Sequence, residues 1–411
     1  MNEEKLYPKY RYIMGALQVL ASSITVLPYM VAAPLLTYLA ADFSVDVATA
    51  GYATTAHILT MGIFIFLGSV VISWIDNKKT QIAGLVIIVA GLAMAWRASS
   101  FGMLLAARVI TGIGHGISGA CTTSVVAAWF PPRERSVVIT INNLVIMGIT
   151  ALGYFIMPPL YHLFGDSWRA VMLFVAGAVA LTALLWILWG RDNRALNEHL
   201  AAQNSSDGRK TNAFSGMREA LSRRDIWTLA VHVGLTTMAV TGMNTYLPQF
   251  LENVRGYTDV AASALTGVIT AVGVAGTLSG GVVTTALGRR KPFIAPFVLA
   301  TAIFGALGLG ARTPWLITSM LILYSLANNF RTTAYQTMAT EFDGTTPALA
   351  AAASAMYNGL GFIGTLALPA LFSLGEGLMG DVGSMLIFMP LFAIAAVISC
   401  FLPETGPKKK G

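Results

Sequence analysis

The stretch that decides the fold reads FGMLLAARVITGIGHGISGACTTSVVAAWFPPRER, from Phe101 to Arg135. Its apolar part, 101–129, is longer than the roughly 20 residues that a membrane-spanning helix needs. Arg108 stands inside this run, where a charged side chain costs at least ~3 kcal/mol. The stretch therefore predicts a membrane helix whose arginine has a structural or functional partner.

The composition places the whole chain in a membrane. Of the 411 residues, 55% are hydrophobic and only 11% are charged, whereas soluble proteins carry roughly 25% charged residues. The two cysteines, Cys121 and Cys400, lie in apolar segments and form neither a disulfide framework nor a metal-ligand spacing. The first apolar run is too long for a signal peptide, so we expect a retained helix.

Apolar runs of spanning length recur along the chain. The predicted spans are 12–39, 47–74, 80–97, 101–129, 136–163, 168–190, 226–251, 260–287, 292–311, 314–339, 346–373 and 380–402. The polar stretch 191–225 is the longest connection between them and predicts a cytoplasmic central loop. It separates two six-helix bundles, 1–190 and 226–411, which gives an all-α membrane fold.

The positive charges predict the orientation. With a cytoplasmic N-terminus, 20 of the 26 Lys and Arg residues fall on the cytoplasmic side and four on the other, while Arg108 and Arg331 lie in spans. Cytoplasmic loops of membrane proteins carry such an excess. We therefore expect both termini in the cytoplasm, and we interpret the net charge of +7 as a topology signal rather than as nucleic-acid binding.

The two halves repeat each other. Three patterns recur at shifts of 211 or 212 residues: Gly148-x4-Gly153-x4-Pro158 as Gly359-x4-Gly364-x4-Pro369, Gly68 with Lys78-Lys79 as Gly280 with Arg290-Lys291, and Phe130 as Phe342. Copies of six helices enter the membrane from the same side, and such parallel repeats hold their substrate between them near the midplane. The Gly and Pro positions predict close packing and bending in the fifth and eleventh helices.

These features resemble the major facilitator superfamily over nearly the whole chain. The resemblance rests on the 6+6 layout, Arg108-x3-Gly112-x-Gly114, Trp129–Arg135, the basic loops after the second and eighth helices, and Pro403-Glu404-Thr405. The segment around Leu247-Pro248, together with Trp129–Arg135, is similar to the cyanate-permease and organic-anion branches. The resemblance implies a transporter rather than an enzyme, with helices 1, 4, 7 and 10 lining a central cavity.

The basic loops depart from the pattern of the family. The expected acid at the end of the second helix is missing, and the copy after the eighth helix has Thr284-Thr285 in its place. Asp76 is the candidate to replace it. The resemblance implies that these loops gate the cytoplasmic side, through residues Asp76, Lys78, Lys79, Gly288, Arg289 and Arg290.

Polar residues form a stripe at helical spacing on each of the four expected cavity helices. The stripes are Gln18, Ser22, Thr25 and Tyr29; Arg108, Thr111, His115, Ser118 and Thr122; Thr237, Thr241, Asn244 and Pro248; and Tyr324, Asn328, Arg331 and Tyr335. A stripe that faced lipid would be costly. We expect the stripes to face one another or water, although Ser and Thr also bond their own helix backbone.

Two arginines in spans without a deep acid suggest that the missing anion is the substrate. The 19 Asp and Glu residues all fall in loops or at span ends. A guanidinium suits a carboxylate, so we predict that Arg331 binds it with Asn328, Tyr324 and Tyr335, with Gln18, Tyr29, Thr241 and Asn244 as further contacts. The alternative is that helix carbonyls and Asn329 hold Arg331. For Arg108, coupling and helix packing remain equal alternatives, and direct substrate contact is a third.

Histidines are the candidate proton carriers, because no carboxylate is deep in a span. His57, His115 and His232 lie in spans, and imidazole changes its charge near neutral pH. The alternative is that each is a neutral hydrogen-bonding group. Gly112-x3-Gly116 and Gly276-x3-Gly280 indicate close helix packing, and Gly114-x-Gly116-x2-Gly119 lacks the preceding strand of a dinucleotide site.

The sequence thus predicts a secondary active transporter for a small, carboxylate-like organic anion. No phosphate-binding loop, metal cluster or catalytic constellation is present in the sequence, so we expect no cofactor. We expect a monomer in a bacterial inner membrane, driven by proton symport or anion exchange. A multidrug or amphiphile exporter is the alternative, and a non-transporting membrane sensor is less favoured, because 191–225 is too short for a signalling domain.

Overall fold

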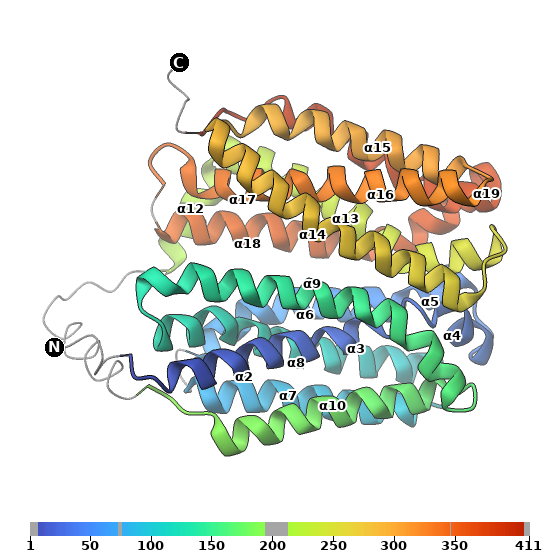
Figure 1. Cartoon of the computed structure of the whole chain (residues 1–411), viewed down its shortest axis with the longest axis horizontal. Coiled ribbons are helices and arrows are strands. Elements are labelled where there is room, and N and C mark those ends of the chain that lie inside the picture. Colours follow the sequence, from blue (N-terminus) through green and yellow to red (C-terminus); the bar gives the residue numbers. More distant parts are fainter. Residues whose placement is uncertain (1–6, 73–75, 194–212, 346, 407–411) are drawn as a thin grey trace, which may run out of the picture. The chain divides into compact units, whose positions relative to one another are not determined.

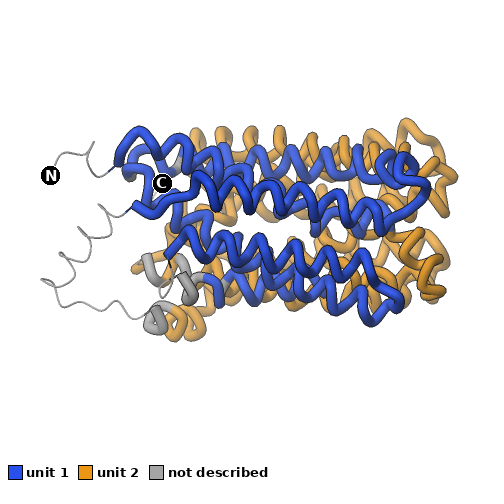
Figure 2. The backbone as a smooth tube through the Cα atoms, turned by 90° about the horizontal axis from the view of Figure 1, so that it is seen from below, with its two compact units in different colours: residues 1–35, 56–211 blue, residues 36–55, 212–411 orange. Residues whose placement is uncertain are grey.

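The computed structural model describes residues 7–72, 76–193, 213–345 and 347–406. The described residues are almost entirely helical, and nine helices among them are long and apolar enough to cross a membrane. Figure 1 labels the helices, and Figure 2 colours the two compact units into which the chain divides, 1–35 with 56–211 and 36–55 with 212–411. Residues 36–55 belong to the first repeat in the sequence, but in the structure they pack with the second unit.

Unit 1 contains most of the first repeat. Its helices are α2 (Arg11–Ile24), α3 (Val26–Met30), α6 (Tyr52–Ile72), α7 (Asn77–Trp96), α8 (Phe101–Trp129), α9 (Pro132–Leu163) and α10 (Trp168–Trp189). Helices α7 and α8 approach closely because glycines face each other: a Cβ on Gly114 would lie 2.5 Å from the carbonyl oxygen of Gly84. The small residues in this part of the sequence therefore set the helix packing.

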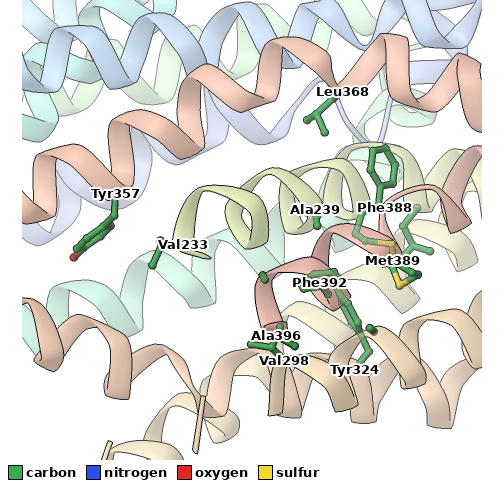
Figure 3. Packing of buried hydrophobic residues seen from close by; sticks show 14 of the residues in the cluster. Val233, Ala239, Val298, Tyr324, Tyr357, Leu368, Phe388, Met389, Phe392 and Ala396 are labelled. Atoms are coloured by element: carbon green, nitrogen blue, oxygen red, sulfur yellow. The ribbon is translucent and has the colours of Figure 1, made fainter. Parts of the chain in front are cut away.

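Unit 2 contains the second repeat together with the segment 36–55. Its helices are α4 (Leu36–Asp42), α5 (Val47–Ala50), α12 (Ala213–Ser222), α13 (Arg224–Asn253), α14 (Asp259–Leu287), η1 (Lys291–Phe293), α15 (Ala295–Gly310), α16 (Pro314–Phe330), α17 (Thr332–Glu341), α18 (Pro347–Gly364), η2 (Thr365–Ala367), α19 (Leu368–Leu386) and α20 (Met389–Ser399). Figure 3 shows part of its apolar core, where the Tyr324 ring meets Phe392 edge-on at 5.8 Å between centroids.

Several predicted spans are interrupted rather than continuous. The first is broken at Thr25 and again over 31–35, a turn that contains Pro34 and precedes α4, and the tenth is broken at Arg331. The 3-10 turn η2 ends two residues before Pro369, and Gly380 has a positive φ of 68° inside α19, at the predicted start of the last span. Proline lacks the N–H that a helix needs, and glycine alone adopts such a φ readily.

The central loop also differs from expectation, because its last part forms helix α12. Ala220 of this helix is fully buried in the core of unit 2, and Met217, one turn earlier, packs against that core. Residues three apart share a helix face. This short apolar face therefore gives the polar stretch a helical end, which its overall composition did not predict; residues 194–212 lie outside the described part.

Candidate functional site

Arg108 in unit 1 is fully buried, and backbone carbonyls hold its guanidinium. Its Nη1 donates to the carbonyl oxygen of Pro28, and its Nη2 donates to that of Tyr29 at 3.2 Å. Both carbonyls belong to the last turn of α3, which ends at Met30. The last carbonyls of a helix lack intrahelical partners and carry partial negative charge. The break in the first span thus creates the acceptor site for Arg108.

The three polar residues beside Arg108 form a hydrogen-bonded row. Nδ1 of His57 lies 3.0 Å from Oγ1 of Thr111, and Nε2 of His57 lies 3.0 Å from Nδ1 of His115. The Tyr29 ring stacks on the His57 ring, with centroids 6.0 Å apart. Gly112 permits this contact, since a Cβ there would lie 2.5 Å from the carbonyl oxygen of His57. Of the three candidate histidines, the structure joins His57 and His115.

The remaining polar residues of α8 bond to other helices of unit 1. Oγ1 of Thr122 lies 3.1 Å from both Nε2 of Gln18 and Oγ of Ser22 on α2. Oγ of Ser118 accepts from Nε2 of Gln81 on α7 at 2.6 Å. The predicted stripe therefore divides, because successive positions turn far enough around α8 to meet different neighbours.

Arg331 in unit 2 is also buried, with 3% of its surface exposed, but its contacts differ. Its Nη2 donates to Oδ1 of Asn328 at 2.8 Å, and its Nη1 lies 3.4 Å from Nε2 of His232. The Tyr335 ring centroid lies 5.5 Å from the guanidinium carbon. Its buried Nε has no hydrogen-bond partner among the described residues. Arg331 therefore keeps an open donor inside unit 2.

The helix break and His232 fix the position of Arg331. Arg331 ends α16 and precedes α17, while Nδ1 of His232 lies 2.9 Å from the carbonyl oxygen of Ala395. A carbonyl only accepts, so His232 is protonated at Nδ1 and offers Nε2 to Arg331. The alternative partner Asn329 instead donates to the carbonyl oxygen of Ser325 at 2.9 Å.

The other predicted substrate contacts are placed less tightly. The hydroxyl of Tyr324 is buried without a partner in the described part of the chain. Thr241 and Asn244 lie on α13, and Thr241 is buried. Asn328 and Tyr335 are therefore the predicted residues that the structure brings to Arg331.

The basic loop after α14 forms a dense network. Gly288 ends α14 with a φ of +63°, Arg289 is exposed, and Arg290 is buried. Nη2 and Nε of Arg290 donate to the two carboxylate oxygens of Glu341 at 2.9 and 3.2 Å, and its backbone N–H donates to Oε1 of Glu404 at 2.8 Å. Such bidentate, charge-assisted pairs are among the stronger hydrogen bonds. Glu341 therefore anchors this loop to the end of α17.

The corresponding loop before α7 is anchored in the same way by a different acid. The backbone N–H of Lys78 donates to Oδ1 of Asp192 at 3.1 Å, and its Nζ donates to the carbonyl oxygen of Ile187 at 3.0 Å. Asp76 makes an exposed ion pair with Lys79 at 3.5 Å. Burial raises the pKa of Asp192 above its ordinary value, although the Lys78 N–H opposes this.

Asp192 and Glu404 are residues that sequence reasoning missed as a pair. They are 212 residues apart, as are Lys78 and Arg290, so the same bond recurs in both repeats. Applying the shift to the ends of the sixth and twelfth spans would have found them. The recurrence also ties each basic loop to its own unit.

The comparison with protein families agrees with this architecture. The sequence profile of the Major Facilitator Superfamily matches residues 19–369. The chain belongs to that superfamily. It is therefore a membrane transporter, not an enzyme, with the all-α fold that the sequence predicts.

Several curated transporters are similar to this superfamily member. The "Probable galactarate/D-glucarate transporter GudP" of Bacillus subtilis (strain 168) is 22% identical over 75% of this chain and 71% of its own length. The "Hexuronate transporter" of the same organism is 24% identical over 69% of this chain and 70% of its own length. The "Lincomycin resistance protein LmrB", also from that organism, is 29% identical, but the match covers 29% of this chain and 25% of that protein.

Solved structures share the fold of this superfamily member. A bacterial homologue of the human lysosomal transporter Spinster, in an inward-facing and unoccupied conformation, has a TM-score of 0.79 and 16% identity over 95% of this chain and 96% of its own. The D-xylose-proton symporter has a TM-score of 0.72 and 16% identity over 97% of this chain and 98% of its own. At such identities the likeness shows the fold alone.

Proposed function

We propose that this transporter moves a small organic anion, with Arg331 binding its carboxylate. The observation that carries the proposal is the open Nε–H of a buried guanidinium, which has no ion pair within the described residues. Leaving a buried donor unpaired costs about 1–3 kcal/mol, and more for a charged group. A bound carboxylate supplies the missing acceptor and the missing charge.

The surroundings of Arg331 favour a planar anion over a cation. Asn328 and His232 hold the two terminal nitrogens, and the Tyr335 ring lies beside the guanidinium. The donor that remains belongs to a planar fork that matches a carboxylate. A cationic drug would meet an uncompensated positive charge there. Tyr324, with its buried unpaired hydroxyl, is a candidate for a second polar contact to the substrate.

The curated relatives support a sugar acid as the substrate class. Two of them are named for galactarate, D-glucarate or hexuronates, and the aligned parts cover about 70% of each. All of these compounds combine carboxylate with several hydroxyl groups. A polyhydroxy carboxylate would use Arg331 for its charged end and neutral donors and acceptors for the rest.

Transport proceeds by alternating access in this proposal, with proton symport or anion exchange as the driving process. The inside-negative membrane potential opposes uptake of an anion by about 2.3 kcal/mol per charge at 100 mV. The Lys and Arg distribution, 20 against four, supports cytoplasmic termini, a bacterial inner membrane fits the bacterial relatives, and we propose a monomer. The basic loops at Lys78–Lys79 and Gly288–Arg290 would gate the cytoplasmic side.

The test uses the purified protein and pairs of compounds that differ in charge. D-glucuronate should raise the melting temperature, whereas D-glucose should not, and D-galactarate should act where galactitol fails. In proteoliposomes, Arg331→Ala should lower kcat/KM for the active anion at least about 30-fold, since truncating one partner of a buried charge pair costs about 2–5 kcal/mol. Arg331→Lys should recover part of it.

Arg312→Ala removes an exposed arginine just before α16 and serves as the matched control. It should transport like the wild type. Wild-type uptake by both Arg331 variants would contradict the proposal. Stabilisation by cationic drugs alone would favour the exporter alternative, to which the short match with the lincomycin resistance protein points.

A further inference from the structure

The paired histidines of unit 1 have no role in the binding of a carboxylate by Arg331. His57 is fully buried on α6, and His115 on α8 is partly exposed. A single hydrogen bond of 3.0 Å joins Nε2 of His57 to Nδ1 of His115. One proton lies between these nitrogens, so the two imidazoles act as one unit.

The neighbouring hydroxyl settles which nitrogens carry the protons when both rings are neutral. Oγ1 of Thr111 lies 2.9 Å from the carbonyl oxygen of Arg108, which only accepts, so the hydroxyl proton points there. The hydroxyl must then accept from Nδ1–H of His57. Nε2 of His57 is left as an acceptor, so Nδ1–H of His115 donates to it.

One basic atom remains at the end of this row. With its Nδ1 protonated and bonded, a neutral His115 carries a lone pair on Nε2, on the partly exposed ring of the pair. A proton that binds there forms an N–H bond and leaves every hydrogen bond in the row unchanged. Each other nitrogen of the pair already takes part in a hydrogen bond.

We propose that Nε2 of His115 is the atom that takes up the co-transported proton, with His57 and Thr111 as positioning residues. The inference rests on the proposed anion transport. One proton adds to a lone pair on one side of the membrane and leaves from it on the other, so no other reactant is needed.

The groups around the pair offer no negative charge to balance an added proton. Arg108 lies two helical turns before His115 on α8, and the phenols of Tyr29 and Tyr154 lie on α3 and α9. Helices α2, α3, α6, α7, α8 and α10 contain no Asp or Glu, and Glu134 of α9 pairs with Arg11. Protonation therefore adds a second positive charge, which an anion entering the protein would offset. Binding of anion and proton should favour each other reciprocally.

The decisive variant is His115→Asn. The asparagine amide reaches the position of Nδ1 and keeps the donor to His57, but it has no basic nitrogen. His162→Gln is the control, because His162 is an exposed histidine of the same unit that pairs with Asp166 at 2.7 Å. Counterflow exchange of labelled D-glucuronate, or of the anion that the thermal-shift panel identifies, first shows that each variant is folded and binds.

The measurement is accumulation of that anion in proteoliposomes with a pH gradient of one unit and the membrane potential clamped at zero. Coupling of one proton to a monoanion should give about tenfold accumulation in the wild type and the control. His115→Asn should give no accumulation while it retains exchange. If the variant is unfolded, His115→Gln replaces it, and proton uptake on binding is measured calorimetrically in two buffers with the wild type.

The possible results separate the two proposals. Tenfold accumulation by the folded His115 variant, or wild-type transport without proton uptake, would overturn the role of His115 and leave anion transport intact. Failure of the wild type to bind or exchange any carboxylate would overturn the anion proposal itself, and the proton inference with it. Exchange without accumulation in the His115 variant alone supports both.

Discussion

The two units share a framework, but they treat their buried arginines differently. In unit 1, both terminal nitrogens of Arg108 donate hydrogen bonds to backbone carbonyls of α3. In unit 2, Arg331 contacts only neutral side chains and keeps an open Nε–H. The repeat shift of 212 carries Arg108 to Met320 and not to Arg331, so the two arginines are not copies of one site.

The histidines of the two units also differ, but here unit 1 has the available group. Both ring nitrogens of His232 are hydrogen-bonded, Nδ1 to the Ala395 carbonyl and Nε2 to Arg331. A proton added to Nε2 would therefore face the N–H of Arg331, and the two donors would repel each other. The pair in unit 1 leaves Nε2 of His115 available. The two units therefore share close glycine packing but differ in their buried polar groups: unit 2 has the unpaired Nε–H of Arg331, where we propose that the anion binds, and unit 1 has Nε2 of His115, where we propose that the proton binds.

The first prediction tests the difference between the two buried arginines. Arg108→Ala removes two charge-assisted hydrogen bonds, each worth about 1.5–3 kcal/mol, and should lower the free energy of unfolding by about 3 kcal/mol. Arg331→Ala removes the hydrogen bonds to Asn328 and His232, but it also removes a buried charge with an unpaired donor, and these effects oppose each other. The substrate-free protein should therefore lose less than about 1 kcal/mol. Denaturant unfolding in detergent measures both. A larger loss for Arg331→Ala would reverse the assignment of the two roles.

The second prediction concerns the framework that the units share. A Cβ on Gly280 would lie 1.9 Å from the carbonyl oxygen of Phe330 on α16, and one on Gly112 would lie 2.5 Å from that of His57. Gly280→Ala should cost about 3 kcal/mol and Gly112→Ala about 2, in the range for overpacking. Gly281→Ala is the control, since its nearest neighbour lies at 3.6 Å. Equal melting temperatures for the Gly280 and Gly281 variants would refute this packing.

The glycine contacts of α8 and α14 were predictable because they depend on spacing along one helix, whereas the close packing predicted at Gly148 and Gly359 was wrong, since a Cβ at either position would have nothing within 4 Å. Gly112-x3-Gly116 and Gly276-x3-Gly280 each face a neighbouring helix closely, as the pattern indicates. The spans, the repeat and the superfamily followed from the same kind of regularity. These features are properties of the order of residue types, so the sequence alone contains them.

The partners of the arginines were not predictable in the same way. Arg108 binds the carbonyls of Pro28 and Tyr29, and every residue has a carbonyl, so the sequence does not mark which are free. Pro28 lies 80 residues before Arg108 in the sequence, so no local pattern around Arg108 indicates this partner. The polar stripe on α8 was recognised from the sequence. However, the direction of the side chains rotates around the helix between Thr111 and Thr122, so they bond to different helices.

The smallest expected change in stability concerns two carboxylates that accept from backbone N–H groups, Asp192 from Lys78 and Glu404 from Arg290. Replacing either acid with Ala removes a backbone cap and should cost about 1–2 kcal/mol. Asp192→Asn keeps the acceptor and removes the carboxylate.

Because burial raises the pKa of Asp192 in the folded state, its protonated form stabilises the fold at low pH, and this contribution is lost as the pH rises through the folded-state pKa. The stability of Asp192→Asn relative to the wild type should therefore increase from acidic to neutral pH, measured by thermal unfolding at several pH values. Glu404→Gln is the matched variant in unit 2, and a relative stability of Asp192→Asn that falls over the same pH range would show that the carboxylate is favoured as a charge.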